Sequence, residues 1–208
     1  MSDRNEELVG DLGVPSPTLI LSPAQLDAMA GHLPDDLIRF LARQGAGMWK
    51  QGKFQFCLPE KFASVCQRIF ADDSRLRPEE THIVGFSAFG ELLAWNEKFE
   101  RVLVALPSLE LRVPAIEDPE ALGSCHLATP LFRLAAREGA FNFIEDTDEA
   151  DYLFDRARKR LGQLELGQCY GFVPALGLGG RARLENLERL DALARFSMLA
   201  DLGTLRMA

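Results

Sequence analysis

The chain has 208 residues, of which 47% are hydrophobic and 26% are charged. These values are ordinary for a globular protein and exclude a disordered or collagen-like chain. The formal net charge is −8, from 31 acidic against 23 basic residues. A negative surface repels a phosphate backbone, so direct nucleic-acid binding is not expected and a basic partner is favoured. The same charge would also serve solubility alone.

The compartment can be inferred from the N-terminus, the apolar runs and the cysteines. The first seven residues carry both charge signs and lead into no apolar run, which is unlike a secretory signal. The longest apolar stretches are far shorter than the roughly 20 residues that span a bilayer. Four widely spaced cysteines within apolar segments are typical of reduced core thiols: Cys57, Cys66, Cys125 and Cys169. We therefore expect a cytoplasmic protein without membrane contact.

Helix signals dominate the first part of the chain. Ser22 is suited to cap a helix that begins at Pro23 and ends at Gly31. Pro34 opens a second helix in the same manner, and Gly45 ends it. The sequence therefore predicts an α-rich N-terminal unit.

A polar stretch with a proline marks the candidate boundary between two units. Before it, a short strand is expected within 51–58 and a third helix over 59–70. The stretch itself, 72–78, contains no periodic apolar pattern. We expect it to divide the chain into domains at 1–76 and 77–208.

The second part is predicted to contain an antiparallel meander followed by helices. Its four candidate strands are rich in β-branched or aromatic residues and are separated by turn residues: 81–86, 91–95, 101–106 and 109–113. Further elements are helices over 130–138, 148–161 and 184–202 and a strand at 169–173. Without regular βαβ alternation, this order indicates an α+β fold, with the α-rich N-terminal unit packed on a C-terminal unit of antiparallel sheet plus helices.

The motifs that could support catalysis are incomplete. Residues 177–182 fit a relaxed dinucleotide-binding pattern, but the helix, second strand and acidic residue that such a unit needs do not follow, so a tight glycine turn is expected. Ser87 lies in a segment that misses G-x-S-x-G at its last position. The histidines lack the spacing of metal ligands on one helix and are each expected to be structural: His32, His82 and His126. We expect no enzyme activity, no cofactor and no metal.

The densest acidic stretch is the candidate binding site, formed by Glu145, Asp146, Asp148, Glu149 and Asp151. Calcium is not indicated, because Asp151 stands where an EF-hand loop needs glycine. Basic residues follow at 156–160, and acid before base along a helix is the order that the helix dipole favours. One interpretation is therefore an exposed charged helix. The other is an acidic surface that docks a basic partner.

Two sets of segments carry a family resemblance. The first set resembles the GAD-like domain of bacterial immunity proteins: 37–45, Met48, Trp49, 52–54 and 59–62. The second resembles the C-terminal domain of type VI secretion DNase-immunity proteins: 82–92, Trp95, Asn96, 161–164, 167–176, Gly179 and Gly180. Both occur in the family's order and together cover most of the chain.

The resemblance implies a cytoplasmic antidote that binds a cognate secreted toxin, commonly a DNase, and protects the producing cell and its kin. It implies no cofactor and no turnover, and it supplies no catalytic residues to carry over. We expect a monomer when free and a heterodimer with the toxin. Because a nuclease site must attract a polyanion, its rim is basic, and the acidic stretch 145–151 is the predicted toxin contact.

A second interpretation remains open from the residues. The chain could be an intracellular ligand-binding or regulatory module that uses a groove between its two units. The turn at Gly179 and Gly180, close in sequence to Tyr170 and Phe172, suggests it.

Overall fold

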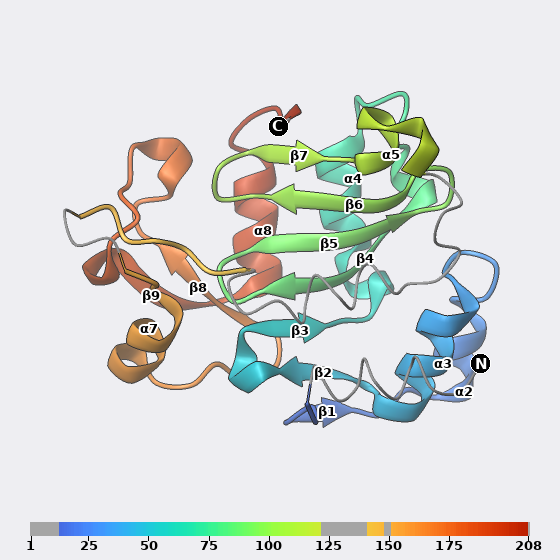
Figure 1. The fold of residues 1–208 in the computed structure, drawn as a ribbon, viewed down its shortest axis with the longest axis horizontal. Coiled ribbons are helices and arrows are strands. Elements are labelled where there is room, and N and C mark those ends of the chain that lie inside the picture. Colours follow the sequence, from blue (N-terminus) through green and yellow to red (C-terminus); the bar gives the residue numbers. More distant parts are fainter. Residues whose placement is uncertain (1–12, 122–140, 148–150, 208) are drawn as a thin grey trace.

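The computed structural model describes residues 13–121, 141–147 and 151–207. Its centre is an eight-stranded sheet in the order β1-β2-β3-β4-β5-β6-β7-β10 (Figure 1). All neighbouring strands are antiparallel except β7 and β10, which are parallel. The strands are β1 (Thr18–Leu19), β2 (Ala46–Trp49), β3 (Phe54–Phe56), β4 (Thr81–Ser87), β5 (Glu91–Asn96), β6 (Glu100–Ala105), β7 (Glu110–Arg112) and β10 (Arg206–Met207). The predicted meander is confirmed as β4 to β7, and the fold is α+β.

Apolar clusters lie on both faces of this sheet. Leu92 and Ala94 of β5 join one apolar cluster with α4 (Ala63–Phe70) and α8 (Ala192–Ala200), which lie behind the sheet in Figure 1. Leu93, between them in the strand, points to the opposite face and joins a second cluster with α3 (Asp35–Gln44). The alternation of side chains along β5 therefore serves two cores at once.

Local capping explains where the first helices begin and end. Ser22 caps α2 (Pro23–Asp27) as the sequence predicts, and with Gln25 it forms a reciprocal capping box; the helix ends at Asp27, before the predicted end at Gly31. Gly45 ends α3 with a φ of 77°. A side chain there would also collide with the backbone of Leu19, since an added Cβ would lie 2.5 Å from its carbonyl oxygen. The remaining short helices are α5 (Pro114–Glu117), η1 (Lys50–Gly52), η2 (Pro59–Phe62), η3 (Pro78–Glu80) and η4 (Pro119–Ala121).

A smaller peripheral unit lies at one end of the sheet, opposite the end that carries α2 and α3 (Figure 1). It contains α7 (Phe154–Leu161) and a two-stranded antiparallel sheet, β8 (Gln168–Phe172) with β9 (Leu187–Asp191). Two single-turn helices connect the strands, η5 (Leu176–Leu178) and η6 (Leu184–Asn186). Phe89, from the β4–β5 turn, packs with Tyr170 and Phe172 and so joins this unit to the central sheet.

The prediction of a single terminal helix over 184–202 is wrong. The segment contains η6, then β9, and only then α8, whose N-terminus is capped by the Asp191 side chain. Leu187 and Leu190 have helical spacing, but both lie in a strand that pairs with β8. Pairing with a distant strand therefore overrides a short local periodicity. The helix predicted over 130–138 lies outside the described residues, as does the start of the one predicted over 148–161.

The expected domain boundary at 76/77 falls between two hydrogen-bonded neighbours, β3 and β4, and it stays a prediction. The buried Gln55 side chain makes a further connection across the chain. Its Nε2 donates to the Gln168 carbonyl at 2.8 Å, and its Oε1 accepts from the Gly167 amide at 2.9 Å. The N-terminal segment is thus hydrogen-bonded directly to the peripheral unit.

The sequence predicts that the cysteines lie in the core and that no segment spans a membrane. Three of the predicted core thiols are buried and free, namely Cys57, Cys66 and Cys169, while Cys125 lies outside the described residues. Within 13–121, 141–147 and 151–207, every helix is too short or too polar to cross a bilayer.

Candidate functional site

The acidic stretch forms a loop beside α7 that is closed by backbone hydrogen bonds. Ile144 and Tyr152 form an isolated antiparallel bridge, and the Glu145 amide donates to the Asp151 carbonyl at 2.8 Å. The Asp146 amide donates to the carbonyl of Ala182, which anchors the loop to the chain before β9. The two described ends of the stretch, 144–147 and 151–152, are therefore held together.

Glu145 points inward and holds the loop in place. Its carboxylate accepts a hydrogen bond from the Leu184 amide at 2.8 Å and pairs with the Arg156 guanidinium of α7. These two partners hold the pKa of the buried Glu145 carboxyl below its usual range. Reversal of Glu145 to lysine would place a cation against Arg156 and is therefore expected to disturb the fold of the loop.

Asp146 and Asp151 are exposed, as a docking surface requires. Asp146 lies 3.4 Å from the Arg181 guanidinium, with both side chains more than half exposed. The Asp151 carboxylate accepts the Tyr152 amide at 2.7 Å. Asp148 and Glu149 lie outside the described residues. The structure thus places two of the five predicted contact residues on the surface and one in the interior.

Two apolar side chains accompany these acids. Ile144 is 56% exposed and Tyr152 is 50% exposed, although both are large and apolar in character. Exposed aromatic and aliphatic side chains with polar neighbours are typical of the centre of a protein interface. Sequence reasoning missed this pair, and the signal that could have found it is an isoleucine and a tyrosine at the two ends of a charged run.

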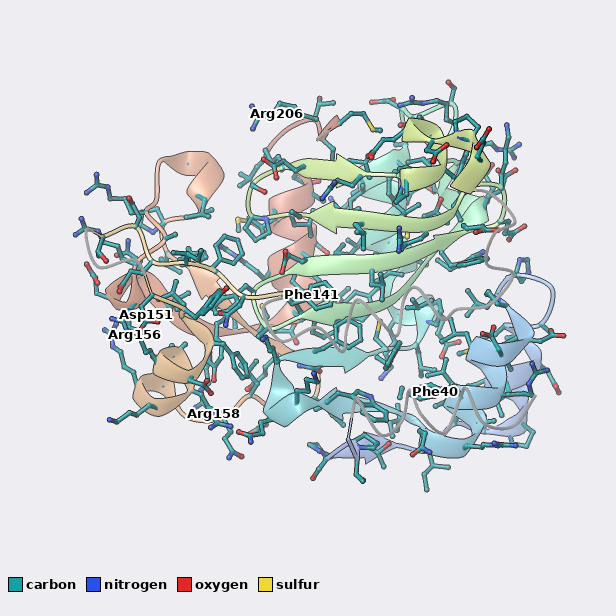
Figure 2. The ribbon with its side chains drawn as sticks, in the orientation of Figure 1. Phe40, Phe141, Asp151, Arg156, Arg158 and Arg206 are labelled. Atoms are coloured by element: carbon teal, nitrogen blue, oxygen red, sulfur yellow. The ribbon has the colours of Figure 1, made fainter. Side chains whose placement is uncertain are left out.

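The basic residues of α7 are largely engaged within the peripheral unit. Arg156 pairs with Glu145, and Arg160 donates to the Leu184 carbonyl. Arg158 lies 3.6 Å from the exposed Asp155. Figure 2 shows Asp151, Arg156 and Arg158 at the same end of the molecule. Acidic and basic residues of this segment therefore have different roles, since the arginines stabilise the unit while Asp146 and Asp151 face solvent.

A groove of about 380 Å³ lies between the N-terminal segment and the peripheral unit. Leu19, Leu166 and Leu193 line it, and each is more than one-third exposed. Tyr170 and Phe172, which suggested a groove from the sequence, are buried in the core instead. The groove is therefore present but is lined by other residues.

The predicted glycine turn is confirmed. Gly179 has a φ of 84° and ends η5, and the next element is the single-turn helix η6 and not the α-helix that a nucleotide-binding unit requires. A Cβ on Gly180 would lie 2.0 Å from the Pro174 carbonyl oxygen, so only glycine allows the two backbones to pass.

Ser87 and the thiol of Cys169, which are nucleophilic residue types, are held in structural roles. The Ser87 hydroxyl accepts hydrogen bonds from the amides of Phe89 and Glu91 and shapes the β4–β5 turn. Burial raises the pKa of the Cys169 thiol to about 12, which keeps it protonated and unreactive. Neither side chain is prepared for nucleophilic attack.

The α+β fold carries exposed acidic side chains, Asp146 and Asp151, beside the exposed Ile144 and Tyr152, an arrangement typical of protein-binding surfaces. Residues 4–107 match the GAD-like domain, and the chain belongs to this family. Residues 132–203 match the C-terminal domain of the type VI secretion system immunity protein Tdi1, which supports a role in type VI secretion immunity. The two domains occur in the order that the sequence resemblance implies, and that prediction is confirmed.

A solved structure supports the architecture. The crystal structure of Atu4351 from Agrobacterium tumefaciens is similar to this chain with a TM-score of 0.88 and 29% sequence identity. The similarity covers 97% of this chain and 90% of that chain. The chain matches none of the curated proteins.

Proposed function

We propose that the protein binds a cognate type VI secretion toxin with DNase activity and neutralises it as a one-to-one complex in the cytoplasm. The observation that carries this proposal is the match of residues 132–203 to the C-terminal domain of an immunity protein. The protein would act as a stoichiometric inhibitor and not as an enzyme, and it would be a monomer before it meets the toxin.

Charge supports a nuclease as the partner. The net charge of −8 favours a basic partner, and a nuclease needs basic residues around its active site to hold DNA. Complementary charge raises association rates to about 10⁸ to 10⁹ M⁻¹s⁻¹. Fast capture is useful here, because the toxin arrives in an active form.

We propose that the loop 144–152 contributes to the toxin contact. Ile144 and Tyr152 would supply apolar area, and the exposed Asp146 and Asp151 would steer a basic surface toward it. Glu145 would act from inside, by holding the loop to Arg156. The predicted contacts Asp148 and Glu149 belong to the same proposal.

The test is reconstitution with the toxin encoded by the neighbouring gene. We expect a one-to-one complex by size-exclusion chromatography with light scattering, and DNase activity that falls linearly to zero at one molar equivalent. The protein alone should not shift duplex DNA in a gel. Full DNase activity in the presence of excess protein, or the lack of a complex, would refute the proposal.

A ligand-binding or regulatory module is the second candidate, and the apolar groove beside Leu19, Leu166 and Leu193 favours it. A thermal-shift screen against nucleotides and metabolites tests it. A specific ligand at 100 times its dissociation constant adds about 2.7 kcal/mol of stability. If Leu166→Asp abolished such a shift, the groove would be the binding site; a screen without any hit would reject this candidate.

A further inference from the structure

Three potential metal ligands from distant parts of the sequence meet at the end of the sheet that carries α2. His32 follows α2, in a turn closed by a hydrogen bond from its amide to the Met29 carbonyl. His82 lies in β4, and Glu97 directly follows β5. The Glu97 amide donates to the Glu80 carbonyl at 2.9 Å, which fixes the backbone that carries its carboxylate.

The side chains already converge on one point. A single Glu97 oxygen, Oε1, lies 2.7 Å from His32 Nδ1 and 2.9 Å from His82 Nε2. One donor atom from each residue lies within 4.8 Å of the other two. Across the described ranges, no other set of three histidine, cysteine or acidic side chains meets this criterion.

We propose that His32, His82 and Glu97 form a binding site for a divalent cation of the zinc class. Two imidazoles and one carboxylate are donors that suit zinc, cobalt or nickel. In a tetrahedral zinc site the donor atoms lie about 3.3 Å apart, since each is about 2.0 to 2.2 Å from the metal. Donor atoms that lie within 4.8 Å can reach this spacing by rotation of the side chains.

Without a cation, the imidazole N–H groups serve the carboxylate as hydrogen-bond donors. With the cation bound, each neutral ring would carry its proton on the other ring nitrogen, and the cation would accept lone pairs from both rings and from Glu97. The side chains of His32, His82 and Glu97 are 54%, 18% and 33% exposed, so a cation can enter from solvent.

The site has room for a fourth ligand. His32 and His82 also line a cavity of about 270 Å³ that reaches Gln25 and Thr81. A water molecule in this cavity would complete a tetrahedron, as in zinc sites with three protein ligands. The bound cation would join the turn after α2 to β4 and to the β5–β6 turn. This proposal does not depend on toxin binding.

Calorimetric titration of the tag-free protein, first treated with a chelator, tests the site. We expect one equivalent of Zn²⁺ to bind and to raise the melting temperature, and Co²⁺ to give the visible absorption of a tetrahedral complex. His32→Ala, His82→Ala and Glu97→Gln should each weaken zinc binding by more than about 100-fold, because losing even an outer partner costs about 10- to 100-fold.

Matched controls separate this site from other donors. Cys125→Ser removes the one thiol and His126→Ala the one imidazole that lie outside the described residues, and Glu79→Gln changes a cavity residue that pairs with Arg77. All three should bind zinc like the unchanged protein. Weaker zinc binding in Cys125→Ser or His126→Ala, or unchanged binding in both His32→Ala and His82→Ala, would overturn the proposal.

A second measurement covers the case in which a variant fails to fold. In the unchanged protein, zinc should shift the ring-proton NMR signals of two of its three histidines, and His126→Ala should leave both shifts in place. No saturable binding, or a shift of fewer than two histidines, would also overturn the assignment.

Discussion

The central sheet and the acidic loop of the peripheral unit are stabilised in different ways. In the core on one face of the sheet, Phe86 of β4 packs with Phe62 of η2 and Phe196 of α8, with ring centroids 5.2 to 6.1 Å apart. In the peripheral unit, the loop that carries the exposed acids is held to α7 and η6 by polar contacts of Glu145. Apolar burial thus provides the scaffold, while a few directed bonds set the shape of the surface that faces a partner. Surface residues of the loop can then change without disturbing the core.

The largest expected change in stability follows from removing an aromatic ring from the core that packs on the sheet. Phe196→Ala should lower the free energy of unfolding by about 3 to 5 kcal/mol, because the side chain is fully buried and leaves a cavity. Leu193→Ala, on the same helix but more than one-third exposed, is the matched control and should cost under about 1 kcal/mol. Urea unfolding measures both. Equal losses would mean that apolar burial does not dominate the sheet.

Next in size is the loss of the Glu145 contacts. Glu145→Ala should cost about 1 to 3 kcal/mol, since it leaves Arg156 and the Leu184 amide without their acceptor. Amides of 144–153 should exchange hydrogen faster, while those of β4 to β6 keep their protection. Asp155→Asn, whose partner Arg158 lies 3.6 Å away on the surface, should change stability by less than about 0.5 kcal/mol. Protected loop amides in Glu145→Ala would contradict the role given to this carboxylate.

A pH-dependent effect is expected at Glu91, at the turn that joins the two regions. Burial raises the pKa of Glu91 to about 7 from 4.5, and its Oε2 atom has no hydrogen-bond partner. Because the folded protein holds this proton more tightly than the unfolded chain does, stability falls as the pH rises from about 4.5 to about 7. Glu91→Gln should therefore gain about 1 to 2 kcal/mol at pH 8 and little at pH 4.5.

Urea unfolding at pH 4.5 and pH 8 measures this gain. Glu110→Gln, an exposed residue of β7, is the control and should change stability equally little at both values. A gain for Glu91→Gln that is the same at pH 4.5 and pH 8 would rule out burial of the charged carboxylate as its cause.

The smallest effect on stability is expected at the exposed acids. Asp146→Lys with Asp151→Lys should change the unfolding free energy by under about 0.5 kcal/mol. It should slow association with the toxin roughly 3- to 10-fold at low salt and less at high salt, because charges at an interface rim act on the encounter. Stopped-flow binding measures this. The control, Glu117→Lys with Glu120→Lys, makes the same change in net charge outside the loop. If the control slowed association equally, the loop would not be the site of toxin contact.

Elements with local signals were predictable from the sequence. The Ser22 cap and the Gly45 helix stop each depend on neighbouring residues, and both are present. The strands β4 to β7 follow one another in the sequence with short turns and are also neighbours in the sheet, so the sequence pattern was enough to predict their pairing. The order of the two family domains was also recognisable, because the motifs of each domain are local segments of the sequence.

Features that depend on distant partners were not predictable. β9 forms because β8 lies beside it, although its leucines have helical spacing. The inward direction of Glu145 depends on Leu184, 39 residues later. His32 and His82 lie 50 positions apart in the sequence. They meet only because the turn after α2 lies beside the start of β4. A single sequence contains no short-range signal for these contacts.

The unbroken sheet limits how such a protein can acquire a new specificity by recombination. A foreign C-terminal part joined at residue 76 would have to supply a first strand that fits the hydrogen-bonding edge of β3 and the packing around Phe54 and Phe56. A crossover after β7 would keep β1 to β7 together, but it would replace α8 and β10 along with the peripheral unit. Exchange of partner preference between relatives should therefore be concentrated downstream of residue 112, and the new part would have to supply a helix that packs on the sheet as α8 does.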